Sequence, residues 1–286
     1  LITLVLMENN MNYLFKQIFL KNPDKEENGI FYFNADDDGD YFTEEDINDW
    51  RTIWFQNNWN ERKLLENQAS NYLISAIIEM GCPVIELACG PGMGLIPSIK
   101  QINPSFPCMA TDASSLVVSE WKRYLDEKEK YDALDFAQFS VLDMPIKSGT
   151  VQAYSSFIGI SSTRSGDSGY RLALSEIYRT LVDGGLLYTI ENEWSDVPAI
   201  LGLFEKMNRQ PWTCFCEEQI SWHDRFIESG FEIVYEQQYE YRSLRTDDNE
   251  LGKASLEFGV DIGMNFTAYI VKKNSSLLSQ GSLFKN

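Results

Sequence analysis

The sequence predicts an α/β protein with a doubly wound, mostly parallel seven-stranded sheet and an N-terminal helical cap. Short apolar segments alternate with helical patterns from residue 84 to residue 190, as is typical of parallel sheets. Glycines at every second position follow the first of these segments, where a strand should meet a helix. The chain has 286 residues, of which 44% are hydrophobic, and can therefore fill a large core.

Residues 1–60 are predicted to form an N-terminal segment and helical cap. Residues 1–7 are apolar but lack a positively charged start, so we interpret them as a disordered leader rather than a signal peptide. Residues 31–33 are predicted to be a short strand or an aromatic plug. Tryptophans at helical spacing after Thr43, an N-cap residue, predict a helix whose aromatic face packs against the domain or covers the ligand pocket.

The acidic run at residues 34–45 leaves two interpretations open. Its oxygen-bearing residues fall on several positions of a calcium loop, from Asn34 at the first to Glu45 at the last. Asparagine leads the run, however, and no second loop pairs with it. An acidic turn before a helix is the favoured interpretation, and no metal site is assigned.

The remaining elements follow in order along the chain. A helix is expected to end at Gly81. Strands are predicted at residues 84–87, 106–111, 139–142, 151–158, 186–190, 231–241 and 261–272. Helices are predicted from residue 95, and at 115–128, 170–181, 200–207 and 217–229. The 19-residue connection at 242–260 is long for a hairpin, and residues 275–286 form a polar tail.

The ligand site is predicted at the turn after residues 84–87. Glu86 lies within that strand, and Asp112 ends the next one, 18 residues after Gly94. The glycines have the spacing G-x-G-x-G, whereas pyrophosphate binders have G-x-G-x-x-G. A carboxylate beside the turn suits a cation, such as an ammonium or a sulfonium.

In these features the chain resembles the class I S-adenosylmethionine-dependent methyltransferases. Their first motif joins an acid to G-x-G-x-G, and their second strand ends in an acid; residues 86–94 and Asp112 match both. The segments 139–158 and 176–185 also resemble the family. The resemblance implies a Rossmann-like methyltransferase fold over residues 61–274, with S-adenosylmethionine as cofactor. It places Asp143 on the adenine amino group and the Met144 N–H on the ring. The cofactor-binding residues so predicted are Glu86, Ala88, Gly90, Gly92, Gly94, Asp112, Ala113, Asp143, Met144 and Phe157.

The predicted function is in-line methyl transfer to a small-molecule acceptor, with the catalytic residues unknown. The cofactor activates the methyl group, so the protein mainly supplies orientation. Many small-molecule members of the family carry a histidine after the fourth strand, and this chain does not. Its single histidine, His223, is expected to be a structural or surface group, and the candidate bases are Tyr188, Glu191 and Glu193. The alternatives are an NAD-dependent oxidoreductase on a Rossmann sheet and a non-catalytic S-adenosylmethionine-binding protein.

Composition narrows the class of partner. With 24 basic against 43 acidic side chains, the net charge is −19, which disfavours a nucleic-acid substrate. No apolar run is long enough for a membrane span. The five cysteines have no zinc-type spacing and indicate reduced thiols in a cytoplasmic protein. The oligomeric state stays open.

Overall fold

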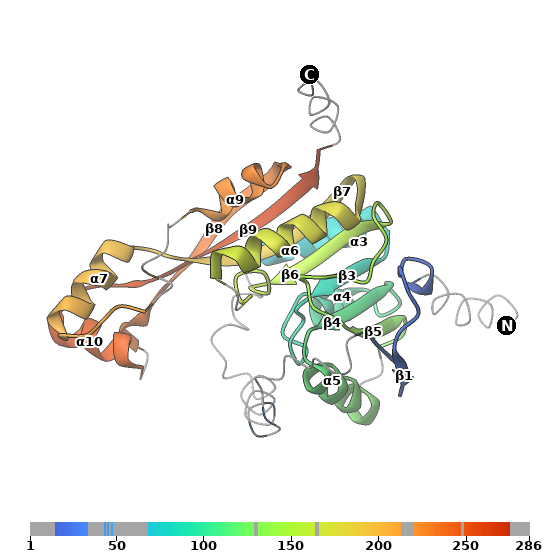
Figure 1. Ribbon diagram of the computed structural model, residues 1–286, viewed down its shortest axis with the longest axis horizontal. Helices are drawn as coiled ribbons and strands as arrows, with labels where there is room; N and C mark the ends of the chain where they lie inside the picture. The colour runs from blue at the N-terminus through green and yellow to red at the C-terminus, as the bar shows by residue number, and fades with distance from the viewer. Residues whose placement is uncertain are drawn as a thin grey trace, which may run out of the picture.

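The computed structural model describes most of the chain from residue 15 to residue 274. The described residues are 15–33, 43, 45, 47, 68–128, 131–163, 166–212, 215, 220–246 and 249–274. The leader at residues 1–7, nearly all of the 34–45 run, the tryptophan-rich helix and the polar tail therefore lie outside the described residues. Figure 1 shows one long twisted sheet with helices on its faces and an extension at one end.

The described sheet contains nine strands in the order β1-β2-β5-β4-β3-β6-β7-β9-β8. From β2 to β7 each strand is parallel to its neighbour, whereas β1 is antiparallel to β2, and β9 is antiparallel to both β7 and β8. The strands are β1 (Lys25–Glu27), β2 (Ile30–Tyr32), β3 (Val84–Leu87), β4 (Cys108–Asp112), β5 (Leu134–Gln138), β6 (Val151–Phe157), β7 (Leu181–Trp194), β8 (Phe231–Ser243) and β9 (Gly263–Lys273).

The predicted number of seven strands is wrong because the N-terminal region adds a hairpin to the sheet. Strands β1 and β2 have three residues each, too few to show an alternating pattern. Strand β2 pairs with β5, with Ile30 opposite Phe136, and Phe31 is buried, so the predicted aromatic strand is confirmed. No N-terminal helical cap is shown by the described residues.

The third predicted strand, at residues 139–142, is also misplaced. The strand is β5, which ends at Gln138, and it is followed by a turn in which the Asp143 N–H donates to the Ser140 carbonyl over 3.3 Å. The sequence pattern misled because Gln138 is polar and yet fully buried, whereas Phe139 is an apolar loop residue that packs in the core.

Helices cover both faces of the sheet, which confirms the doubly wound prediction. On one face lie α3 (Gln68–Met80), α4 (Ile96–Ile102) and α5 (Ser115–Lys128), and on the other lie α6 (Gly166–Thr180) and α9 (Trp222–Glu228). Each face buries its own apolar cluster, because side chains alternate between the two sides of every strand. None of the described helices is both long and apolar enough to cross a membrane.

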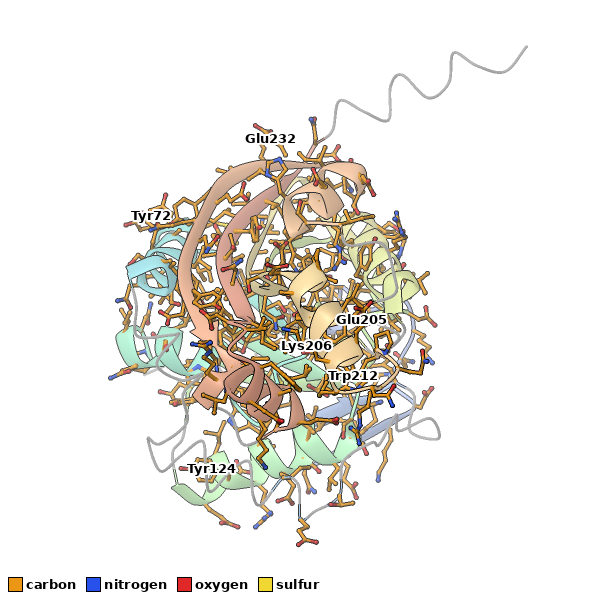
Figure 2. The ribbon with its side chains drawn as sticks, turned by 90° about the vertical axis from the view of Figure 1, so that its left-hand side faces the viewer. Tyr72, Tyr124, Glu205, Lys206, Trp212 and Glu232 are labelled. Carbon is orange, nitrogen blue, oxygen red and sulfur yellow. The ribbon has the colours of Figure 1, made fainter. Side chains whose placement is uncertain are left out.

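The extension in Figure 1 is an arm formed by the long strands β7, β8 and β9. It carries α7 (Val197–Lys206), the 3-10 turn η2 (Leu244–Thr246) and α10 (Glu250–Phe258), which share a third apolar core. The predicted helix at 200–207 therefore corresponds to α7. The long connection before the last strand contains η2 and α10. Figure 2 looks onto the arm, with Glu205, Lys206 and Trp212 near its centre.

Candidate functional site

The glycine turn follows the central strand of the sheet, where the direction of winding reverses. Strand β3 has β4 on one side and β6 on the other, and all three are parallel. The connection after β3 leads to β4 on one side, and the connection after β6 leads to β7 on the other side. The two connections therefore diverge at the carboxyl ends of β3 and β6. Open α/β sheets bind ligands at such a switch point. The predicted site is thus at the place where the fold favours one.

Every second residue from 88 to 92 in the turn has a positive φ, in the left-handed region of backbone conformation. Ala88 has φ of 48°, Gly90 of 55° and Gly92 of 91°. A Cβ at Gly92 would lie 2.6 Å from Nε1 of Trp121, and a Cβ at Gly94 would overlap the carboxyl group of Glu86. Gly92 and Gly94 are therefore required by contacts with the protein itself. The half-buried Gly90 is the glycine of this turn that is accessible from outside.

Glu86 holds the helix that follows the turn. Its side chain is fully buried, and its carboxylate accepts hydrogen bonds from the backbone N–H groups of Leu95 (2.5 Å) and Ile96 (3.3 Å). Burial raises the pKa of Glu86 to about 7, although these hydrogen bonds and one from Ser155 oppose the shift. The carboxylate stabilises the start of α4. A contact with a cationic ligand would require Glu86 to be exposed beside the turn, but its side chain is buried.

Asp112 joins the turn to the end of β4. Its Oδ2 accepts a hydrogen bond from the Gly90 N–H over 3.0 Å, and its Oδ1 accepts one from the Ser114 N–H over 3.1 Å. Asp112 is half-buried and the neighbouring Ala113 is exposed. The predicted proximity of the second acid to the glycine turn is therefore present in the structure.

Gln138 is a site residue that sequence reasoning missed. Its Nε2 donates to the Ala113 carbonyl over 2.8 Å, while its Oε1 accepts from the Phe33 N–H over 3.3 Å. This side chain, only 1% exposed, fixes the backbone beside Asp112. A glutamine next to an apolar segment was the available clue, but the sequence does not reveal its two partners.

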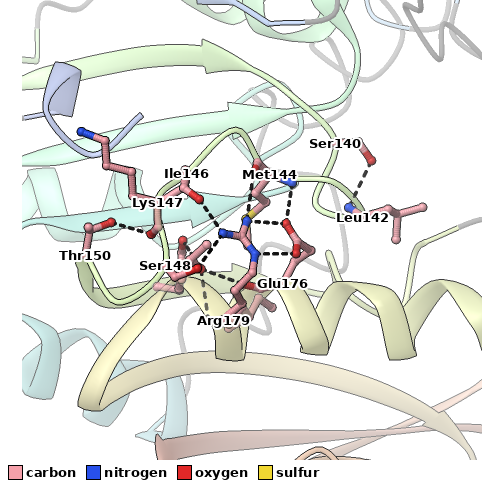
Figure 3. Close-up of polar contacts among 12 residues, drawn as sticks. Ser140, Leu142, Met144, Ile146, Lys147, Ser148, Thr150, Glu176 and Arg179 are labelled. Atoms are coloured by element: carbon pink, nitrogen blue, oxygen red, sulfur yellow. Dashed lines mark hydrogen bonds and ion pairs between the residues drawn. The ribbon is translucent and has the colours of Figure 1, made fainter. Parts of the chain in front are cut away.

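Asp143 and Met144 lie on the connection from β5 to β6. Asp143 is exposed, whereas Met144 is buried and its N–H donates to Oε2 of Glu176 over 2.9 Å. The guanidinium of Arg179 donates hydrogen bonds to the Met144 and Ile146 carbonyls and to the Glu176 carboxylate (Figure 3). Arg179 and Glu176 both belong to α6. The Met144 N–H thus already has a partner, and its role toward an adenine ring stays a prediction.

Glu176 is ionised in this arrangement. Burial acts to raise the pKa of Glu176, but the hydrogen bonds from Arg179 and Met144 outweigh it, and the net pKa is lowered. The pair stabilises the connection between β5 and β6 from the α6 side of the sheet.

A second turn leaves the sheet after β6, directly beside the glycine turn. It follows Phe157, which is 7% exposed, and begins at Ile158, whose φ of 56° is unusual for a β-branched residue. The buried carboxylate of Glu191 accepts the Ser161 N–H over 3.0 Å and the Thr189 hydroxyl over 2.6 Å. Burial raises the pKa of Glu191 to about 7. Such strained backbone clusters at functional sites.

Comparison with known proteins agrees with the family that the motifs predicted. No protein-family model matches the chain. A demethylmenaquinone methyltransferase of Lactococcus lactis subsp. lactis (strain IL1403) is 26% identical over 125 residues, which are 44% of this chain and 48% of that protein. The chain thus matches about half the length of this curated relative.

A solved methyltransferase structure shows the same fold. A geranyl diphosphate methyltransferase, solved in complex with GPP and sinefungin, aligns with a TM-score of 0.50 and 15% identity over 73% of this chain and 78% of that one. The MccD protein aligns with a TM-score of 0.49 and 19% identity over 71% of this chain and 96% of that one. The chain is similar to the S-adenosylmethionine-dependent methyltransferases.

The candidate bases of this methyltransferase-like chain all have partners. Tyr188 is buried, and its hydroxyl lies 3.4 Å from the sulfur of Met80. Glu193 accepts a hydrogen bond from the Trp222 N–H, and burial raises its pKa. His223 is on the surface, where Nδ1 lies 2.7 Å from Glu236.

Two further features bear on ligands elsewhere in the described chain. A hollow of about 420 Å³ lies between α10 and the residues that follow α7, at the end of the arm and not at the glycine turn. Among the residues that the structure describes, no group of three or more histidine, cysteine, aspartate or glutamate side chains could hold a metal ion.

Proposed function

We propose that the chain is an S-adenosylmethionine-dependent methyltransferase that transfers a methyl group in line to a small-molecule acceptor. The observation that carries this proposal is the turn after β3, which joins a left-handed Gly90 to Asp112 at the switch point of the sheet. The sequence similarity to a curated methyltransferase and the fold shared with another support the same reaction class.

The accessible residues of the turn fit an adenosyl cofactor. Ala88, Gly90 and Asp112 are half-buried and Ala113 is exposed, so main chain and one carboxylate are available to a ligand. A short carboxylate side chain at the end of the second strand suits the hydroxyl groups of a ribose. S-adenosylmethionine supplies a methyl group that its sulfonium has already activated. We further propose contacts from Asp143, Met144 and Phe157, and an indirect role for the buried Glu86, Gly92 and Gly94.

The acceptor is expected beside the turn after β6. That turn carries hydroxyl side chains at Ser161, Ser162 and Thr163, and it is adjacent to the arm. The relatives act on demethylmenaquinone and geranyl diphosphate, which are small molecules. The net charge of −19 favours such an acceptor over a nucleic acid, and we propose a cytoplasmic enzyme.

Calorimetric titration of the purified chain tests the cofactor. We expect binding of S-adenosylmethionine and S-adenosylhomocysteine, and none of NAD. Asp112→Asn removes the charge but keeps the shape, and it should weaken S-adenosylmethionine binding by about tenfold, since hydrogen bonds to charged groups are worth about 1.5 to 3 kcal/mol. Asp126→Asn, which changes an exposed carboxylate on α5, is the matched control and should bind as the wild type does.

Transfer of the methyl group is a separate test. Incubation with methyl-labelled S-adenosylmethionine and a pool of metabolites should move the label into a small molecule. A label that never leaves the cofactor would favour the non-catalytic binding protein. Binding of NAD in place of S-adenosylmethionine would favour the oxidoreductase.

A further inference from the structure

Trp121 lies on α5 and contacts the glycine turn from the protein side. It is 2% exposed, and its indole packs edge-to-face on Phe136 with ring centroids 5.4 Å apart. Its Nε1, Cε2 and Cδ1 atoms lie 2.6, 2.8 and 3.2 Å from the place where a Cβ on Gly92 would be. The flat indole therefore occupies the space that the missing side chain of Gly92 leaves free.

The turn depends on support of this kind. Within it, Met93 N–H donates to the Cys89 carbonyl, and the Gly90 N–H reaches outward to Asp112. Gly92 adopts a φ of 91°, which glycine reaches easily. Because glycine has no side chain to restrict its backbone rotation, Gly92 by itself does not hold the turn in one conformation. A rigid neighbour that excludes other conformations holds the turn in the shape that a ligand meets. Such preorganisation raises affinity without a direct contact.

We propose that Trp121 is a positioning residue for the cofactor, acting through Gly92. This inference rests on the proposed function, because it concerns affinity for S-adenosylmethionine. Trp121 does not touch the ligand; its indole face sets the position of the Gly92 main chain, and Gly92 sets the position of the accessible Gly90. The absence of a side chain at residue 92 is thus matched to the tryptophan on α5 and not to the cofactor.

A double-mutant cycle between residues 92 and 121 tests the contact. Gly92→Ala should weaken S-adenosylmethionine binding by at least about tenfold, since its Cβ meets the indole and its φ of 91° disfavours a side chain. Trp121→Met keeps apolar volume on a flexible chain that can move aside. Trp121→Met alone should weaken binding about fivefold, but combined with Gly92→Ala it should recover at least about fivefold of the affinity lost by Gly92→Ala.

Two controls separate positioning from stability. Leu125→Ala removes a buried side chain one turn further along the same helix and in the same apolar cluster. It should lower the free energy of unfolding, leave S-adenosylmethionine affinity within about twofold, and give no recovery with Gly92→Ala. Trp121→Phe retains a flat ring and should also bind within about twofold of the wild type.

The emission of Trp121 gives a measurement that does not depend on Trp121→Met folding. Subtracting the fluorescence of Trp121→Phe from that of the wild type isolates this indole, and S-adenosylmethionine should change the difference. An unchanged difference spectrum, or additive effects in the cycle, overturns the positioning role. A wild type that fails to bind S-adenosylmethionine overturns the proposed function itself, whatever the variants do.

Discussion

The turn after β3 and the turn after β6 leave neighbouring parallel strands and solve the same structural problem. Each begins with a residue other than glycine in the left-handed region, Ala88 at φ of 48° and Ile158 at φ of 56°. Each is held by a fully buried glutamate that accepts backbone N–H groups, and burial raises the pKa of both Glu86 and Glu191 to about 7.

The two turns differ in where their support comes from. Glu86 belongs to the strand that precedes its own turn, so the supporting contacts lie within ten residues. Glu191 belongs to β7 and supports Ser161, which lies 30 residues earlier in the chain. The glutamate contact of the first turn is therefore encoded locally and can be read from sequence, whereas Asp112 and Trp121 add support from further along the chain. The second is assembled by the tertiary fold, and its sequence shows only small and hydroxyl-bearing residues.

Alanine at the close-contact glycine of each turn should give the largest effect. At Gly94 the new Cβ would overlap the Glu86 carboxyl group, which is confined by α4, and we expect a loss of about 3 kcal/mol in the free energy of unfolding. At Gly159 the Cβ would meet Ser156 Oγ at 2.6 Å and Ala88 Cβ at 2.9 Å, for a loss of about 2 kcal/mol. Urea unfolding measures both.

Gly202→Ala on α7 is the control for these two variants. No atom lies within 4 Å of its Cβ position, and alanine favours a helix, so this variant should be more stable by about 0.5 kcal/mol. If Gly94→Ala unfolds at the same urea concentration as the wild type, the close packing of Glu86 beneath the turn does not exist in solution.

The two glutamates should each make stability depend on pH. Their folded-state pKa of about 7 lies above the usual 4.5, so the folded chain binds more protons than the unfolded chain between these values. The free energy of unfolding should therefore fall as the pH rises from about 4.5 to about 7. Glu86→Gln and Glu191→Gln should each reduce that fall by about 1 to 3 kcal/mol, as measured by urea unfolding at about pH 5 and about pH 8.

The size of the two reductions sharpens the comparison of the turns. Equal reductions are expected because both carboxyl groups are fully buried and hydrogen-bonded. A pH profile that keeps its full slope in one variant would mean that water reaches that carboxylate, and that its turn is the more open of the two.

The sequence predicted the elements around the glycine turn well because each is set by a pattern within a short stretch of chain. The strand at 84–87, the helix at 115–128 and the second strand ending at Asp112 all agree with the structure. The closely spaced glycines were interpreted as allowing the close approach of other protein atoms or of a ligand. In the structure, the bare positions at Gly92 and Gly94 are filled by Trp121 and Glu86, which sequence spacing cannot reveal.

Other parts of the fold depend on partners that are distant in sequence. Strand β2 has three residues and exists because β5 lies beside it. The end of β5 was misplaced because Gln138 is buried through its bonds to Ala113 and Phe33, 25 and 105 residues away. The arm likewise arises from strands that extend past the sheet, where α7 and α10 supply a separate core.

Substitution of His223, the single histidine of the chain, should have the smallest effect on stability. It also tests whether this histidine takes part in the chemistry near either turn. His223 lies on α9 with its side chain 49% exposed, and the hydrogen bond that its ring donates to the Glu236 carboxylate raises its pKa. Because solvent screens this pair, His223→Gln should change the free energy of unfolding by less than about 0.5 kcal/mol. That small contribution should be present at low pH and lost as the pH rises through the raised pKa, since the pair exists only when the imidazole is protonated. Methyl-transfer rates should match the wild type across the same pH range. A large loss of rate with unchanged stability would place this histidine in the chemistry and require α9 to approach the turn after β6.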